Sequence, residues 1–165
     1  MSIKRGHKGF TLIEILVVIG IIAILAAIVI IAINPARQFA QARNSQRTAN
    51  VNAILNAVGQ YVADNKGVLP PGLNALADDT PANIAANICA DIVPVYMPAL
   101  TVDPLTDPDG AGALVAGQAV PAASCAAATN IGYTMQHSAT DRVKICAPGG
   151  VEPSIPGSAV ICVER

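Results

Sequence analysis

The chain has 165 residues, 53% of them apolar, with no Trp, three Tyr and two Phe, and a formal net charge of −1. This balance argues against a basic nucleic-acid-binding domain, so no nucleic acid is expected as a partner. Much of the apolar content lies near the N-terminus. The head that follows the N-terminal helix, about 100 residues rich in Ala, Pro and Gly, is enough for one small domain with a thin core.

An apolar run of 24 residues, 10–33, comes after a short leader that contains Lys4, Arg5 and Lys8. As a helix it would span about 36 Å, enough to cross a hydrocarbon core of about 30 Å. The basic leader would hold its start on the cytoplasmic side. The run is too long for the apolar region of a cleaved secretory signal, which has about 7–15 residues. An ordinary membrane anchor remains an alternative.

Glu14 is the single charged residue of this run. A carboxylate at the centre of a membrane costs about 2.5–3.5 kcal/mol on insertion scales, so it needs a partner. We expect none nearby within the helix. The partner is therefore expected on another chain or at a new N-terminus.

The string Gly9-Phe10-Thr11-Leu12-Ile13-Glu14, after a basic leader and before an apolar helix, resembles the N-terminal motif of type IV pilins and type II secretion pseudopilins. The resemblance implies that a prepilin peptidase cleaves between Gly9 and Phe10 and then methylates the Phe10 amine, giving N-methylphenylalanine. It also implies an assembly role for Phe10 and Glu14. A neighbouring subunit's Phe10 amine would pair with Glu14 and set the axial register, because a slip would leave a buried charge unpaired.

The resemblance further implies an α+β, pilin-like fold, with a long N-terminal helix on a small antiparallel β-sheet head. The expected segments are a leader (1–9), a transmembrane and assembly helix (10–33), its amphipathic continuation (34–67) and a globular head (68–165). The implied protein is a structural subunit of a type IV pilus (fimbrium) or a type II secretion pseudopilus. A membrane-anchored minor pilin, or an extracellular module for adhesion or DNA uptake, is the alternative.

The implied location is the bacterial inner membrane, crossed once with the head outside, and then an extracellular pilus or a periplasmic pseudopilus. The implied partners are further copies of the chain, the prepilin peptidase, the membrane, and an assembly platform with its ATPase. Small residues of the apolar run would let neighbouring helices approach closely. They are Gly20, Ala23, Ala26 and Ala27.

A proline interrupts the helical pattern at Asn34-Pro35. We favour one long helix that is kinked here, although Asn34 could instead cap a new helix with Pro35 at its first position. An apolar stripe with helical spacing then predicts packing against the head, and Gly67 is a helix stop. The stripe consists of Val51, Ile54, Leu55, Val58, Tyr61 and Val62.

Three arginines, Arg37, Arg43 and Arg47, lie on the part of this helix nearest the membrane. They are expected to form a solvated, snorkelling basic face. The alternative is that they pair with acids of an adjacent subunit's head or with lipid phosphates.

Proline density in 88–107 predicts an irregular, extended loop. Its Asp103-Pro104 resembles the pattern before the calcium loop of major pseudopilins. Asp103, Asp107 and Asp109 could supply oxygen ligands to calcium, but Asp-Pro and Asp-Gly are also ordinary turn pairs. No other cofactor is required, so calcium is the one candidate.

Strands are predicted over 130–136, 142–146 and 158–163, whereas 111–128 reads as an exposed loop. The four cysteines lack the spacing of a zinc or redox site and predict two disulfides in a translocated head. Three connectivities exist, and the locally simplest joins Cys89 to Cys125 and Cys146 to Cys162.

The sequence does not contain the motifs that an enzymatic function would need. Outside the leader the sequence has one histidine, His137, which is expected at the surface of a hairpin turn beside Ser138. No nucleophile motif or phosphate-binding glycine loop accompanies it. The sequence therefore predicts a structural protein.

Overall fold

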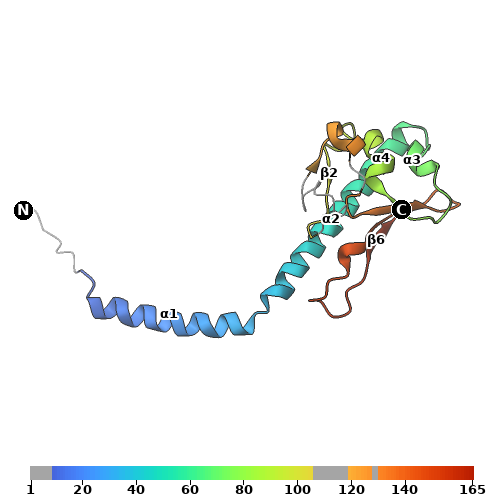
Figure 1. Cartoon of the computed structure of the whole chain (residues 1–165). Helices are drawn as coiled ribbons and strands as arrows, with labels where there is room; N and C mark the ends of the chain where they lie inside the picture. Colours follow the sequence, from blue (N-terminus) through green and yellow to red (C-terminus); the bar gives the residue numbers. More distant parts are fainter. Residues whose placement is uncertain (1–8, 106–118, 128–129) are drawn as a thin grey trace, which may run out of the picture. The chain divides into compact units, whose positions relative to one another are not determined.

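The computed structural model describes residues 9–105, 119–127 and 130–165. The chain divides after Ala36 into two units. The first unit contains α1 (Leu12–Ala32), and α2 (Pro35–Asp64) begins at its end and continues into the second (Figure 1). The predicted α+β, pilin-like architecture is confirmed: an apolar N-terminal helix is followed by a second helix and an antiparallel sheet.

Helices α1 and α2 are separate, so the single kinked helix that the sequence favoured is wrong. Ile33 is extended, with φ −98° and ψ 121°, and Pro35 is the first residue of α2. The reason is that Pro35 has no N–H to donate and its ring clashes with a preceding helical turn, while a first helical position tolerates both. The alternative with Pro35 at that position is the one observed.

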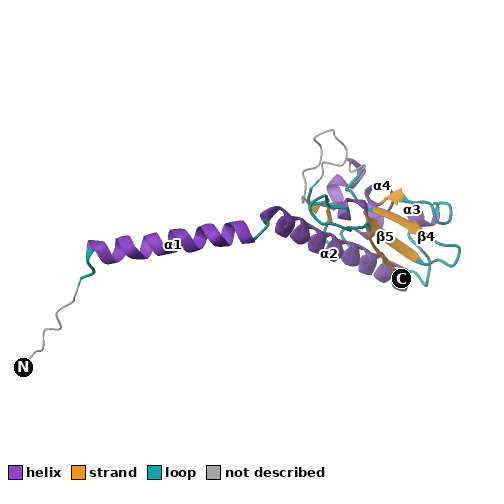
Figure 2. Ribbon diagram, turned by 90° about the horizontal axis from the view of Figure 1, so that it is seen from below, coloured by secondary structure: helices purple, strands orange, loops and turns teal. Residues whose placement is uncertain are grey.

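The head consists of α2 and a four-stranded antiparallel sheet in the order β1-β4-β5-β6 (Figure 2). The bounds are β1 Ala82–Asn83, β4 Thr134–His137, β5 Val143–Ala147 and β6 Ile161–Glu164. Along β5 the residues alternate between buried and half-buried, as expected for a sheet with one face on the core. Each of the three predicted strands overlaps one of these, and only the very short β1 was not predicted.

Helix α2 contributes the predicted apolar stripe to the core. Val51, Ile54, Leu55 and Val58 are buried, and Tyr61 and Val62 are half-buried at its edge. The buried residues of the stripe share one core cluster with sheet residues. The sheet's share includes Met135 and Ile145, which are partners in the β4–β5 register. The helix ends near the predicted stop, where Gly67 has φ +91°, a conformation that favours glycine.

The start of the predicted 88–107 loop is instead helical. Helix α4 (Ile84–Ile92) places Ile84, Ile88 and Ile92 on one buried face. Prolines begin only at Pro94, and the spacing before it is that of an amphipathic helix. The remaining elements are short: α3 Pro71–Asn74, β2 Leu100–Thr101 paired with β3 Ala119–Val120, and the 3-10 helices η1 Ala122–Ala127 and η2 Pro148–Gly150. Part of the predicted 111–128 loop lies outside the described residues; the rest includes β3 and η1.

Two disulfides join Cys89 to Cys125 and Cys146 to Cys162, the pairs that proximity along the chain favoured. The first connects α4 to η1. The second joins directly opposite residues of β5 and β6. The first therefore fastens the short η1 to α4, and the second fastens the edge strand β6 to β5.

Candidate processing and assembly site

Gly9 and Phe10 precede α1 and are exposed, with the Phe10 side chain 84% exposed. A Cβ added at Gly9 would meet nothing within 4 Å in the part of the chain that the structure describes. The fold of this chain therefore leaves the peptide bond between Gly9 and Phe10 accessible and does not itself require glycine there.

Glu14 is held in a capping box at the start of α1. The N–H and the hydroxyl of Thr11 both donate to Glu14 Oε2, at 2.8 and 2.7 Å, and the Glu14 N–H donates to Thr11 Oγ1 at 3.3 Å. The expectation that Glu14 has no nearby partner is therefore wrong. Thr11 followed three residues later by Glu14 is the sequence signature of this box, so the contact was readable.

The surface of α1 is mostly apolar, and the described residues leave it uncovered. Residues Leu12–Ile30 are long and apolar enough to cross a membrane, with a mean hydropathy of 3.2, and no part of this segment is buried against the part of the chain that the structure describes. The small residues Gly20, Ala23, Ala26 and Ala27 are all exposed. Without a large hydrophobic driving force in lipid, such residues permit close helix–helix approach and van der Waals contact.

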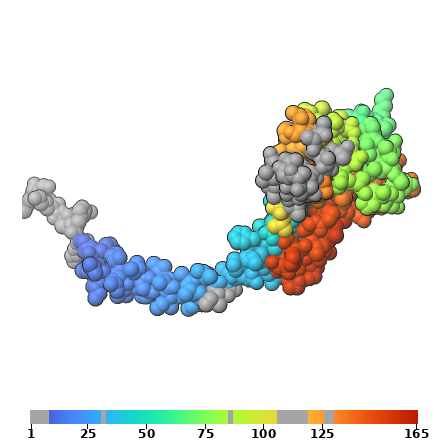
Figure 3. Space-filling model, viewed as in Figure 1, coloured from blue at the N-terminus to red at the C-terminus, as the bar shows by residue number. Residues whose placement is uncertain are grey.

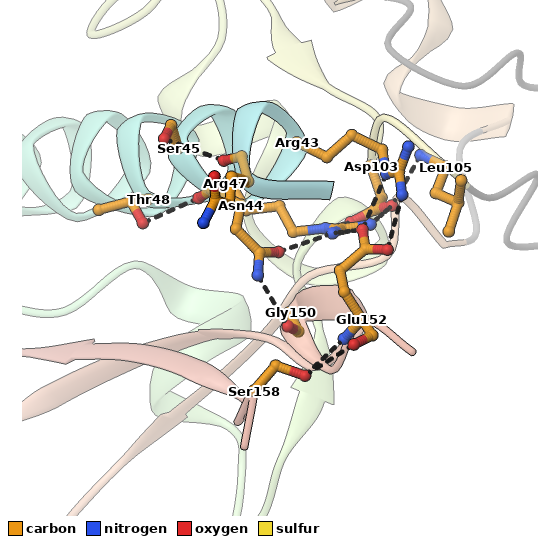
Figure 4. Close-up of polar contacts among 11 residues, drawn as sticks. Arg43, Asn44, Ser45, Arg47, Thr48, Asp103, Leu105, Gly150, Glu152 and Ser158 are labelled. Atoms are coloured by element: carbon orange, nitrogen blue, oxygen red, sulfur yellow. Dashed lines mark hydrogen bonds and ion pairs between the residues drawn. The ribbon is translucent and has the colours of Figure 1, made fainter. Parts of the chain in front are cut away.

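A buried ionic cluster ties α2 to two loops of the head (Figure 4). Arg47 Nε and Nη2 donate to the two oxygens of Asp103 at 2.6 and 2.8 Å, and Arg47 Nη1 donates to Glu152 at 2.5 Å. Arg43 makes a bidentate pair with Glu152, at 2.8 and 2.7 Å. Asn44 donates to the Gly150 carbonyl at 3.0 Å. The segment that carries Glu152 lies directly against α2 in the space-filling view (Figure 3).

Burial makes this cluster electrostatically strong. The Arg47 side chain is 0% exposed, and those of Asp103 and Glu152 are 1% and 2% exposed. Hydrogen bonds from Arg43 lower the pKa of Glu152 to about 2, with Arg47 adding to the effect against the opposing effect of burial. The hydrogen bonds to Asp103 raise the pKa of Arg47. Glu152 and the two guanidinium groups are therefore charged at neutral pH.

Both sequence readings of Arg43 and Arg47 are wrong. These side chains do not form a solvated face, and they need no acid from another subunit and no lipid phosphate, because they pair with acids of the same head. Arg37, in contrast, has an exposed side chain. Helical spacing alone could have placed Arg47 inward, since it lies one turn before Val51 of the buried stripe.

Of the three aspartates predicted as calcium ligands, the structure describes Asp103 alone. Asp103 is buried and both of its oxygens accept from Arg47, with Oδ1 also accepting from the Leu105 N–H at 3.0 Å. Asp107 and Asp109 lie outside the described residues. Calcium binding stays a prediction, and any such site must draw most of its oxygens from groups other than Asp103. A calcium titration with a thermal-melt readout tests it; an unchanged melt at millimolar calcium would count against the site.

His137 is not the surface residue that the sequence predicted. It ends β4, is 6% exposed, and its Nε2 lies 3.0 Å from the Leu76 carbonyl oxygen. The turn begins only at Ser138, whose hydroxyl is 2.9 Å from that of Thr140. His137 therefore fastens the α3 region to the sheet.

Residues 4–32 match the family described as the prokaryotic N-terminal methylation motif. The chain thus carries this motif on a pilin-like α+β architecture. It is 42% identical over 88 residues to the fimbrial protein EcpC of Eikenella corrodens, a match covering 52% of this chain and 50% of that protein. It is 38% identical over 91 residues to the type IV wide pilus major component PilA4 of Thermus thermophilus, covering 51% of this chain and 65% of that one.

These matches span half to about two thirds of the length of the two relatives. No solved structure matches the chain. The chain therefore carries the methylation motif and is similar, over about half of its length, to named pilus components.

Proposed function

We propose that this chain is a filament subunit of a type IV pilus, matured by cleavage between Gly9 and Phe10 and assembled through α1. One observation carries the proposal: a membrane-length apolar helix, covered by nothing in the part of its own chain that the structure describes, comes directly after an exposed Gly9–Phe10 bond inside a methylation motif. Before assembly the membrane would solvate this helix. In the filament the same surface would be buried against copies of itself.

Processing would create the charge that assembly uses. Hydrolysis of the Gly9–Phe10 bond leaves a carboxylate on Gly9 and an amine on Phe10, and methylation of that amine preserves a cation at neutral pH. The capping box would hold Glu14 in a fixed rotamer until a neighbouring Phe10 amine arrives. Pairing between these charges would be strong in the dry filament interior. It would chiefly penalise wrong registers, because desolvation offsets much of the gain.

A pilus is favoured over a secretion pseudopilus. Both relatives carry pilus or fimbrial names. The Asp103-Pro104 resemblance to pseudopilins loses weight, because Asp103 serves as the internal partner of Arg47. Two disulfides in a small head also suit a filament that is exposed outside the cell.

The first test is the N-terminus of the mature protein, measured by mass spectrometry on membrane and sheared surface fractions. The proposal expects a chain that starts at N-methylated Phe10 and is present in sheared filaments. An intact leader in all fractions, or a cut after α1, would overturn it.

The role of Glu14 is tested separately with Glu14→Ala and the matched Glu14→Gln. Glu14→Gln keeps an acceptor for the Thr11 donors but removes the charge, so it should be processed normally and assemble poorly. Filaments at the wild-type level from both variants would exclude Glu14 as the register-setting residue.

A further inference from the structure

An apolar hollow of about 190 Å³ opens on the head beside the second half of α2. Its apolar walls come from Leu55, Val58 and Val62 of α2, from Leu69 beyond the helix and from Val143 of β5. An apolar cavity of about 150 Å³ is large enough to hold a benzene ring. The hollow can therefore accept one aromatic ring or one branched aliphatic side chain, and no residue in the described part of the chain fills it.

Gly59 of α2 also lines the hollow and keeps it open. A Cβ added at Gly59 would meet nothing within 4 Å among the described residues, so packing inside the head does not require glycine there. The residue lies in the interior of a helix, where glycine is less favourable than alanine. A ligand that occupies the space above Gly59 would explain why the helix has a glycine at this position.

Two side chains of opposite charge, Asp141 and Arg165, stand at the rim of the hollow. Asp141 is exposed in the turn between β4 and β5, and among the described residues its carboxylate has no hydrogen-bond or ion-pair partner. Arg165 follows β6 and lies over α2, where its Nη1 donates to Asn56 Oδ1 at 3.0 Å (Figure 2). That bond leaves most of the five guanidinium N–H donors for a ligand. The neighbouring Arg142 and Glu164 pair with each other, at 3.2 Å.

We propose that the hollow binds a free amino acid with a bulky apolar side chain, such as leucine or phenylalanine. The side chain would fill the apolar space, the ammonium group would pair with Asp141, and the carboxylate would pair with Arg165. A few polar groups around an apolar pocket are the usual means of orienting a small ligand. An uncharged molecule would leave both rim charges unused, and a molecule with a single charge would pair with only one of them.

The proposal does not depend on the proposed filament function, because every lining residue belongs to the head of one chain. The expected affinity is low. Burial of one branched side chain together with two exposed ion pairs corresponds to half-saturation at about millimolar ligand. L-Leucine and L-phenylalanine should bind about tenfold more tightly than L-alanine, because the alanine methyl group leaves most of the hollow empty.

Methyl NMR of the full chain in lipid nanodiscs measures this binding and locates it. Saturable shifts are expected at the methyl groups of Leu69 and Val143, and none at Ile88 of α4, which does not line the hollow. Gly59→Leu places an aliphatic side chain in the hollow and should weaken L-leucine binding by about tenfold. Gly59→Ala, the matched control, should weaken it less. Thermal melting of each variant checks that the head stays folded.

The two rim charges are tested with variants and with ligands that each lack one group. Isoamylamine is leucine without the carboxylate, and isocaproate is leucine without the ammonium group. Asp141→Asn removes the carboxylate and keeps a residue that tolerates the φ of 56° at this position. It should weaken L-leucine and isoamylamine by about two- to fivefold and leave isocaproate unchanged. Arg165→Met should weaken L-leucine and isocaproate and leave isoamylamine unchanged.

No saturable binding of L-leucine or L-phenylalanine by the wild-type chain up to about 10 mM would overturn the inference. Equal affinities for L-leucine, isoamylamine and isocaproate in the wild type and in both charge variants would also overturn it, because the hollow would then bind apolar groups without recognising charge. A Gly59→Leu variant that lowers filament yield, with no amino acid bound by the wild type, would assign the hollow to a second copy of the chain and refute the proposal.

Discussion

Replacing Arg47 with Met should destabilise the head by about 3–5 kcal/mol, the usual effect of breaking a buried ion pair on one side. Arg47 is fully buried, and its guanidinium supplies two bonds to Asp103 and one to Glu152. Met fills similar space but removes both guanidinium bonds from the buried Asp103 carboxylate, while the Leu105 N–H still donates to it. Glu152 would keep its bidentate bond from Arg43, so most of the loss comes from Asp103.

Two further variants test whether the loss comes from the unpaired charge of Asp103 and not from lost packing. Arg47→Met/Asp103→Asn removes the uncompensated charge and should recover at least half of the lost free energy of unfolding. Arg43→Met should lose less than Arg47→Met, because the Arg43 side chain is 25% exposed and its bidentate bond goes to Glu152, which Arg47 also contacts.

The measurement is urea unfolding of the full chain in a nonionic detergent, monitored by far-ultraviolet circular dichroism. A loss below about 1 kcal/mol for Arg47→Met, the range of exposed pairs, would refute the reasoning. So would a double variant no more stable than Arg47→Met.

Three further predictions concern acid, disulfides and the core. The pKa of Glu152 is lowered from 4.5 to about 2 in the folded chain, so ionised Glu152 adds on the order of 3 kcal/mol to the free energy of unfolding. This stabilisation is present above about pH 5 and is lost as the pH falls toward 2. Unfolding measured at a series of acid pH values should show the loss, and Glu152→Gln should abolish this pH dependence. Cys146→Ser/Cys162→Ser opens a 16-residue separation and should cost about 3 kcal/mol in denaturant unfolding, with no effect predicted on the α1 helix signal. Ile54→Ala, at a fully buried position, should cost about 2–5 kcal/mol, whereas Val68→Ala, at 59% exposure, should change stability by less than about 0.5 kcal/mol.

Local patterns in the sequence were sufficient to predict most of the fold. The apolar stripe of α2 and the alternation in β5 repeat with the period of their element, so each is visible within a few residues. Pro35 was likewise recognised as a break, although its preference for a first helical position was underweighted. The capping box of Thr11 and Glu14, three residues apart, is also a local pattern, although the sequence analysis did not use it.

The ionic cluster could not be predicted from such patterns. Arg47 meets Asp103 and Glu152 across 56 and 105 residues of chain, and nothing in a single sequence pairs a given arginine with a given acid. His137 presents the same problem, since its partner Leu76 is 61 residues away. Tertiary contacts decide whether such polar residues are buried, and local propensity does not report them.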